Sequence, residues 1–298
     1  MAASPTTIGI EGLRSPAKRR YWAALRGAPL IPIAILSVVV FCGIFGNFIA
    51  PHDPEAPDPL LRLQPPAWEA DGDWTYPLGT DPVGRDMLSR LIVGSQVSLL
   101  IGVTVVLIAG TIGTVLALLS GYFRGFADAV ISRITDAFIS MPFLVIAVAF
   151  AGIVGPSLNH LILILGLLSW AGYARILRGE VLRVCQQDFI LLAQITGVPA
   201  WRIMLRHVFP NIANTLIVLA TLQLGITIIA SASLDFLGLG IPPPRPAWGG
   251  MLAEGRIYMR TAWWVVTVPG VAIALTVMST NLMGDWLRVK LDPKNRGM

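Results

Sequence analysis

The sequence predicts an all-α membrane protein, a polytopic bundle of six transmembrane helices. Hydrophobic residues make up 55% of the 298 residues, and charged residues make up only 13%. Soluble domains carry about 25% charged residues. The apolar residues are gathered in long uncharged stretches, and most lysines and arginines flank these stretches. We therefore expect much of the surface to face lipid.

The predicted spans are apolar stretches of at least the ~20 residues with which a helix crosses the hydrocarbon core. A helix is expected in each, because backbone groups within lipid must satisfy one another. The first stretch is too long for the core of a cleaved signal, so we predict a retained helix. Residues 137–174 lack Asp, Glu, Lys and Arg but are too many for one crossing, and Gly155-Pro156-Ser157 divides them as a turn. The six predicted spans are 30–50, 91–123, 130–154, 158–177, 212–234 and 262–287.

An even number of spans places both termini on one side of the membrane. Of the 22 lysines and arginines, 16 fall on the side of the termini and six on the other. Basic residues favour the cytoplasmic side, so both termini are predicted to be cytoplasmic. The predicted organisation is a cytoplasmic N-terminal segment 1–28 and a transmembrane domain 29–296. This domain contains an external segment 51–89 and a cytoplasmic loop 180–210.

The loop 180–210 is predicted to form a helix–turn–helix. The spacing of Phe189, Leu192, Ala193 and Thr196 is typical of one helix face. Gly197 and Pro199 then interrupt the pattern, and a second short helix is expected over 200–209.

No pattern in the sequence indicates a catalytic, cofactor or metal site. A phosphate-binding G-x-x-x-x-G-K-[ST] loop, an H-E-x-x-H zinc motif and a G-x-S-x-G nucleophile elbow are all missing. The three histidines lie in three different segments, and two cysteines cannot form a four-ligand site. The net charge of +5 is spread along the flanks of the spans, which favours membrane topology over nucleic-acid binding.

Three acidic residues lie near span ends, where an unpaired charge is costly. Asp136 is predicted to pair with Arg133, and Asp285 with Arg288, each at i,i+3 spacing on one helix. Asp235 ends the fifth predicted span, at its outer boundary.

Three stretches, in this order, resemble the hallmarks of one transporter family. They are YPLGTDPVGRDMLSRLIVGSQVSL at 76–99, ASLDFLGLGIPPPRPAWGGM at 232–251 and NLMGDWLRVKLDP at 281–293. Together they are similar to the C-type permeases of dipeptide, oligopeptide and nickel importers of the ATP-binding-cassette (ABC) type. The resemblance extends from about residue 29 to 296.

The resemblance implies a type I ABC importer permease-like fold in the bacterial cytoplasmic (inner) membrane. It implies a homologous second permease, two ATP-binding subunits that carry ATP and magnesium, and an extracytoplasmic solute-binding protein. This chain would bind no cofactor and would line the path for peptides or similar small solutes. The sequence leaves open which solute is carried and which permease is the partner.

The family's ATPase-coupling loop is similar to residues 188–211 here. Ala193, Gly197 and Pro210 fall where the family pattern has them, whereas Leu191 and Leu192 stand near positions where small or acidic residues are usual. The predicted coupling residues are Asp188, Ala193, Gly197, Trp201, Arg202, Arg206 and Pro210. The residues predicted for the translocation path or its gate are Asp235 and Asn281. A stand-alone ion-coupled carrier, a membrane-embedded enzyme and a purely structural subunit remain as alternatives.

Overall fold

The computed structural model describes residues 28–291, and the described chain is almost entirely helical. Of the predicted N-terminal cytoplasmic segment 1–28, only Ala28 is described. Residues 292–296 of the predicted transmembrane domain also lie outside the described part of the chain.

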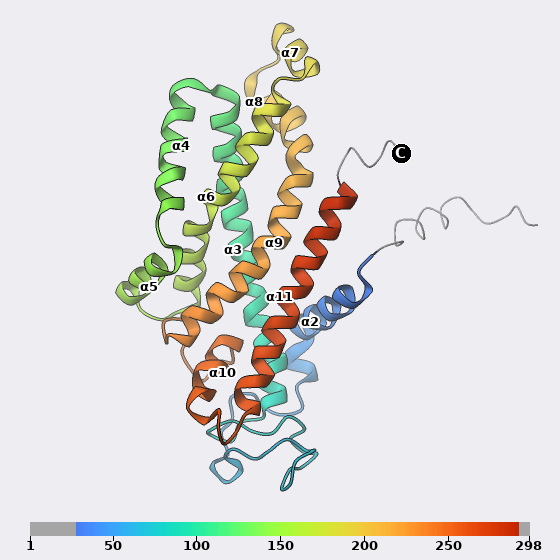
Figure 1. The fold of residues 1–298 in the computed structure, drawn as a ribbon, viewed down its shortest axis with the longest axis vertical. Coiled ribbons are helices and arrows are strands. Elements are labelled where there is room, and N and C mark those ends of the chain that lie inside the picture. Colours follow the sequence, from blue (N-terminus) through green and yellow to red (C-terminus); the bar gives the residue numbers. More distant parts are fainter. Residues whose placement is uncertain (1–27, 292–298) are drawn as a thin grey trace, which may run out of the picture.

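Within 28–291, five helical stretches are long and apolar enough to cross a membrane, and a bent helix pair makes a sixth candidate. Figure 1 shows the long helices running roughly along one axis, with α2 tilted away from the others. The predicted polytopic helix bundle is therefore confirmed, with five continuous candidate spans and the bent pair in the place of the remaining predicted one. The long helices are α2 (Leu30–Ile49), α3 (Met87–Phe123), α6 (Leu158–Val184), α9 (Phe209–Phe236) and α11 (Trp264–Leu291).

The third predicted span, 130–154, is not one continuous helix. The structure has α4 (Gly125–Ser140) and α5 (Phe143–Val154), which meet at an angle of 86°. Pro142 explains the bend, because proline has no amide hydrogen and forces the preceding residue out of the helical region. Met141 indeed has extended backbone angles, φ −82° and ψ 138°. Pro142 could have predicted the break, but it lies within a long uncharged run that suggested a continuous helix.

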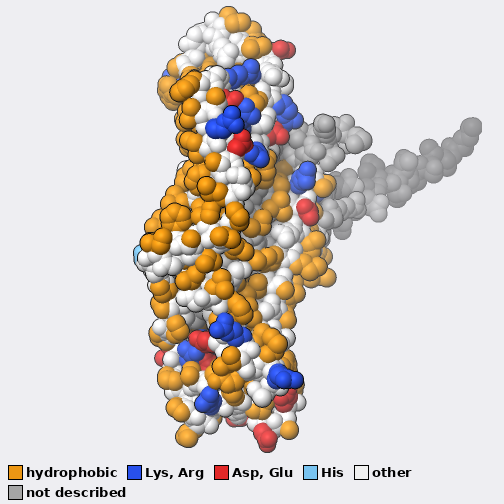
Figure 2. Space-filling model, turned by 60° about the vertical axis from the view of Figure 1, so that its left-hand side comes forward, with side chains coloured by type: hydrophobic (Ala, Val, Ile, Leu, Met, Phe, Trp, Pro, Cys, Tyr) orange, Lys and Arg blue, Asp and Glu red, His pale blue; other side chains and the backbone are white. Residues whose placement is uncertain are grey.

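The two ends of the bundle differ. Figure 1 shows the short helices α7 (Asp188–Ile195) and α8 (Ala200–Ile203) at one end, toward which α11 also runs. The segment that joins α2 to α3 and the short helix α10 (Trp248–Gly255) lie at the opposite end. In Figure 2 apolar side chains cover the middle of the visible face, and charged side chains gather toward both ends. The arrangement is that of a bundle with a lipid-facing belt.

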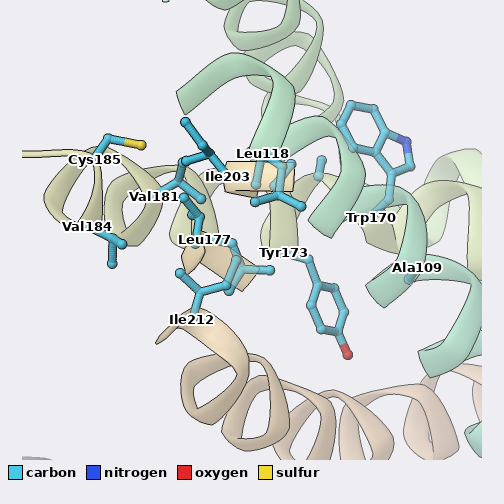
Figure 3. Close-up of a cluster of buried hydrophobic side chains, with 14 of the residues drawn as sticks. Ala109, Leu118, Trp170, Tyr173, Leu177, Val181, Val184, Cys185, Ile203 and Ile212 are labelled. Carbon is cyan, nitrogen blue, oxygen red and sulfur yellow. The ribbon is translucent and has the colours of Figure 1, made fainter. Parts of the chain in front are cut away.

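Close packing of α3 against α6 forms the centre of the bundle. A Cβ atom added to Gly113 would lie 2.4 Å from the Cβ of Tyr173 and 2.8 Å from the carbonyl oxygen of Trp170. Only a small residue permits this approach of two helices. The largest buried cluster, drawn in Figure 3, grows from this contact and joins α3 and α6 to α8 and the start of α9.

Candidate functional site: the α7–α8 loop and the opposite end cap

The loop between α6 and α9 is held by a tightly defined turn at the end of α7. The amide of Val198 donates to the carbonyl of Ala193 at 3.1 Å, and the amide of Gly197 donates to Gln194 at 3.0 Å. These are the two hydrogen bonds of a Schellman motif, whose turning residue has a positive φ. Gly197 has φ +74°, and a Cβ there would meet nothing within 4 Å. The backbone angle, rather than lack of space, therefore requires glycine.

One side of the loop is anchored in the bundle. Ile190 of α7 and Ile203 of α8 are fully buried in the cluster of Figure 3, as are Val208 and Ile212 further along the chain. Ala193 and Val198 pack against the same cluster and are half-buried. The loop is thus a rigid extension of the helices below it.

The other side of the loop presents apolar side chains to the outside. Leu192 is 61% exposed, Ile195 83% and Trp201 57%, and Phe189 and Leu191 are exposed beside them. Exposed apolar patches of this kind mark interaction sites. We call these five residues the α7–α8 apolar face.

The polar residues predicted for coupling lie beside the α7–α8 apolar face. Asp188 is exposed at the start of α7, and Arg206 is exposed below α8. The guanidinium of Arg202 lies over the Trp201 ring, 5.4 Å from its centroid, a cation–π contact that orients both side chains. Leu191 and Leu192, which depart from the family pattern, both belong to the exposed face.

The second helix of the loop was predicted to end at residue 209. In the structure it continues into α9. Residues Met204–Val208 form a π-helical turn, in which the amide of Phe209 donates to the carbonyl of Met204. Pro210 explains the wider turn, because it cannot donate to the carbonyl four residues earlier. The side-chain amide of Asn211 donates to the carbonyl of His207 at 2.6 Å, which occupies one of the carbonyls in this turn.

Asp235 organises the turn that follows α9. Its carboxylate oxygen Oδ1 accepts a hydrogen bond from the amide of Ile241 at 2.9 Å, and the residue is buried. Gly238, with φ +78°, turns the chain back. A Cβ at Gly240 would lie 1.6 Å from the Asp235 carboxylate, so this close return also needs glycine. The second hallmark stretch is therefore a folded turn around a buried acid. A role of Asp235 in the path stays a prediction.

Asn281 lies elsewhere, on the exposed side of α11. It lines an open groove of about 540 Å³ together with Ile229 of α9 and Met278 of α11. Within the described residues no hydrogen bond or ion pair joins Asn281 to Asp235. A polar side chain exposed in an apolar span suits a partner or a water-filled path better than lipid. The path assignment of Asn281 likewise stays a prediction.

The first hallmark stretch builds a buried cluster of charges at the opposite end of the bundle. Arg85 donates to Asp81 at 2.5 Å and to Glu254 of α10 at 2.7 Å. Arg90 donates to the same Glu254 at 3.0 Å, and its Nε lies 3.4 Å from Asp81. Two positive and two negative side chains balance, as buried charges require. Neither Arg90 nor Glu254 was singled out from the sequence, because their partners lie far away in the chain.

Indole groups join α11 to the end cap and α10 to α3. Trp264 donates to the carbonyl of Thr80 at 3.0 Å, and Trp248 donates to the carbonyl of Leu91 at 2.9 Å. Asp86 caps α3 by accepting hydrogen bonds from the amides at the start of the helix. The segment 51–89 is thus a rigid structural cap with defined contacts to α10 and α11.

The predicted i,i+3 ion pairs are wrong. Asp136 pairs with Arg175 of α6 instead of Arg133, and its neighbour Asp128 pairs with Arg178. Packing of α4 against α6 brings these groups together. Each acid therefore pairs with an arginine of the neighbouring helix instead of one on its own helix. No Asp285–Arg288 ion pair forms in the described chain either, and both side chains are exposed.

Comparison with known proteins identifies the family of this chain. The family model described as "Binding-protein-dependent transport system inner membrane component" matches residues 113–297, which include the α7–α8 loop and the Asp235 turn. The chain belongs to this family. It is a transmembrane permease subunit of an ABC importer, from the group that contains the peptide permeases.

Individual relatives extend the match over the end cap. The chain is 41% identical to the di/tripeptide transport system permease protein DppC of Pseudomonas aeruginosa, over 88% of this chain and 86% of that one. It is 42% identical to the probable D,D-dipeptide transport system permease protein DdpC of Escherichia coli K12, over 92% and 90%. For the dipeptide permease DppC of the same strain the values are 41%, 92% and 91%.

A solved structure confirms the fold. A chain of the inward-facing MetNI methionine ABC transporter matches with a TM-score of 0.57 at 20% identity, covering 69% of this chain and 97% of that one. The binding-protein-dependent permease is therefore a multi-pass membrane protein of the type I importer fold, as the sequence predicted.

Proposed function

We propose that this permease imports short peptides across the bacterial inner membrane, together with a homologous second permease. The relatives named as dipeptide, di/tripeptide and D,D-dipeptide permeases support this substrate class. ATP and magnesium are bound by two partner ATPase subunits, and this chain contributes no nucleotide site and no cofactor. The family match favours this function over a stand-alone carrier, an embedded enzyme or a purely structural subunit.

The α7–α8 apolar face is the observation that carries the proposal. A short amphipathic helix that enters a groove on a partner is a recurrent recognition mode. Here the buried Ile190 and Ile203 fix α7 and α8 to the bundle. The exposed Leu192, Ile195 and Trp201 supply the apolar contact. Tryptophan and arginine, as at Trp201 and Arg202, are residue types enriched among binding hot spots. We propose that this face docks on an ATPase subunit.

This assignment sets the orientation of the chain. The α7–α8 loop and both termini are cytoplasmic, as the distribution of basic residues predicts. The end cap around Asp81 and Glu254 then faces outward, where it receives the solute-binding protein.

Coupling proceeds through a continuous rod. The chain from Ala200 to Phe236 is helical throughout, so that movement of α8 is transmitted along α9 to the turn at Asp235. ATP binding closes the two ATPase subunits, displaces the docked loop and tilts α9. The solute path then switches from inward-open to outward-open.

The docking step can be tested by a charge in the apolar face. Leu192→Asp is expected to release the ATPase subunits during purification and to abolish uptake of a labelled dipeptide into proteoliposomes. The matched control is Gln186→Asp, which adds the same charge at an exposed position outside the α7–α8 apolar face. If Leu192→Asp retained both the ATPase subunits and uptake, the proposed docking surface would be wrong.

A further inference from the structure

A groove between α3 and α9 contains two buried hydroxyl groups without a partner. Tyr173 is 3% exposed and Thr114 6%, and in the described chain neither side-chain oxygen makes a hydrogen bond. Both line a groove of about 420 Å³. Figure 3 shows the phenol of Tyr173 directed away from the other labelled core side chains, toward α9. Apart from these two and Thr111, the lining residues are apolar or glycine.

Unpaired buried hydroxyls are rare in folded proteins, because each loses the hydrogen bonds that it makes in water. A water molecule would satisfy them but would leave the apolar walls empty. Gly110 lies beside the Tyr173 ring, and a Cβ added there would be 3.7 Å from it. An apolar pocket with a few converging polar groups is typical of a site for an amphiphilic ligand.

The height of the groove indicates which amphiphile it takes. Tyr173 comes two residues before Arg175, which pairs with Asp136 at the level where charged side chains begin. The two hydroxyls therefore lie at the boundary between the apolar belt and the polar end. In a bilayer this boundary holds the ester groups of phospholipids, between the hydrocarbon core and the headgroups.

We propose that the groove binds one acyl chain of a membrane phospholipid, whose ester carbonyl accepts hydrogen bonds from Tyr173 and Thr114. The groove volume of about 420 Å³ lies in the range of about 300–1,000 Å³ that is typical of ligand pockets. The exposed Leu107 and Ile217 flank the opening through which the chain enters from the bilayer.

The bound chain also contacts the π-helical turn near the start of the coupling rod. Leu205 lies in the π-helical turn and Phe209 directly follows it, and both line the groove. An acyl chain against these two side chains braces the turn between the α7–α8 loop and α9. Lipid occupancy is measured without solute, so this proposal stands or falls independently of the proposed peptide import.

The test uses the complete importer in nanodiscs with a photoreactive phosphatidylglycerol. One probe carries ester-linked chains and the other carries ether-linked chains of equal length, which lack only the carbonyl. The ester probe is expected to label peptides of α3 and α9 about five-fold or more above the ether probe, the ratio that two net hydrogen bonds give. Equal labelling by both probes would refute the proposed contact.

Variants of the groove separate specific binding from general contact with lipid. Tyr173→Phe and Thr114→Val should each reduce the ester preference, and Thr111→Trp should block labelling by filling the opening. Tyr122→Phe removes a hydroxyl from α3 outside the groove and should change nothing. If Tyr173→Phe does not fold, Thr114→Val and the two probes on the unaltered importer still decide the question. Absence of labelling at α3 and α9 would mean that another subunit covers the groove, and would overturn the proposal.

Discussion

Substitution of Gly197 tests whether the turn after α7 matters for energy coupling. In Gly197→Leu the new Cβ meets no atom within 4 Å, but the backbone angle φ of +74° forces leucine into the left-handed region. That conformation costs about 1–2 kcal/mol for a residue with a side chain. The Schellman hydrogen bonds of Val198 and Gly197 hold only the end of a short exposed helix, so we expect this cost to unwind it locally.

A cost of about 1–2 kcal/mol reduces the docking-competent population of α7 by roughly 5- to 30-fold where the helix end is marginally stable. Dipeptide uptake and solute-stimulated ATP hydrolysis should fall accordingly, while membrane insertion stays normal. Gly197→Asn should retain most activity, because asparagine tolerates the left-handed region.

The matched control for Gly197→Leu is Gly179→Leu on α6. Gly179 is also exposed and also has nothing within 4 Å of an added Cβ, but it lies within a regular helix. It should therefore tolerate leucine. Full uptake by Gly197→Leu, or an equal loss in Gly179→Leu, would refute the conformational argument.

Further predictions concern the end cap, the helix packing and the cysteines. Glu254→Gln leaves two buried arginines undercompensated and should destabilise the protein by about 2–3 kcal/mol, seen as a lower Tm, whereas Asp285→Asn at an exposed position of α11 should not. Gly113→Leu should prevent accumulation of folded protein in membranes, because α3 and α6 cannot separate by the required distance; a normal yield would contradict this. A cysteine in place of Thr196 should react with an impermeant maleimide only from the cytoplasmic side, and labelling from outside would refute the orientation. Burial raises the pKa of the Cys185 thiol, so its alkylation should be slow at neutral pH and accelerate as the pH rises, which mass spectrometry can follow.

Local sequence patterns, each formed by residues close together in the chain, were sufficient to predict most of the helices. Long uncharged runs predicted the spans, and Gly197 with Pro199 predicted the break in the loop, because apolar length and turn chemistry act locally. The bend at Pro142 was equally local, but the charge-free run around it suggested one helix.

The sequence by itself determined that the chain enters a membrane, roughly where it crosses, and which family it resembles, since all three depend on residue types in sequence order. Only the tertiary structure decided that Asp136 meets Arg175, that Glu254 neutralises two arginines of the first hallmark stretch, and that Tyr173 faces a groove. The physical reason is that pairs on one helix can be read from spacing, whereas contacts between helices depend on how far each is rotated and how closely it packs. Small residues such as Gly113 set that approach, and with it the partner of each charge.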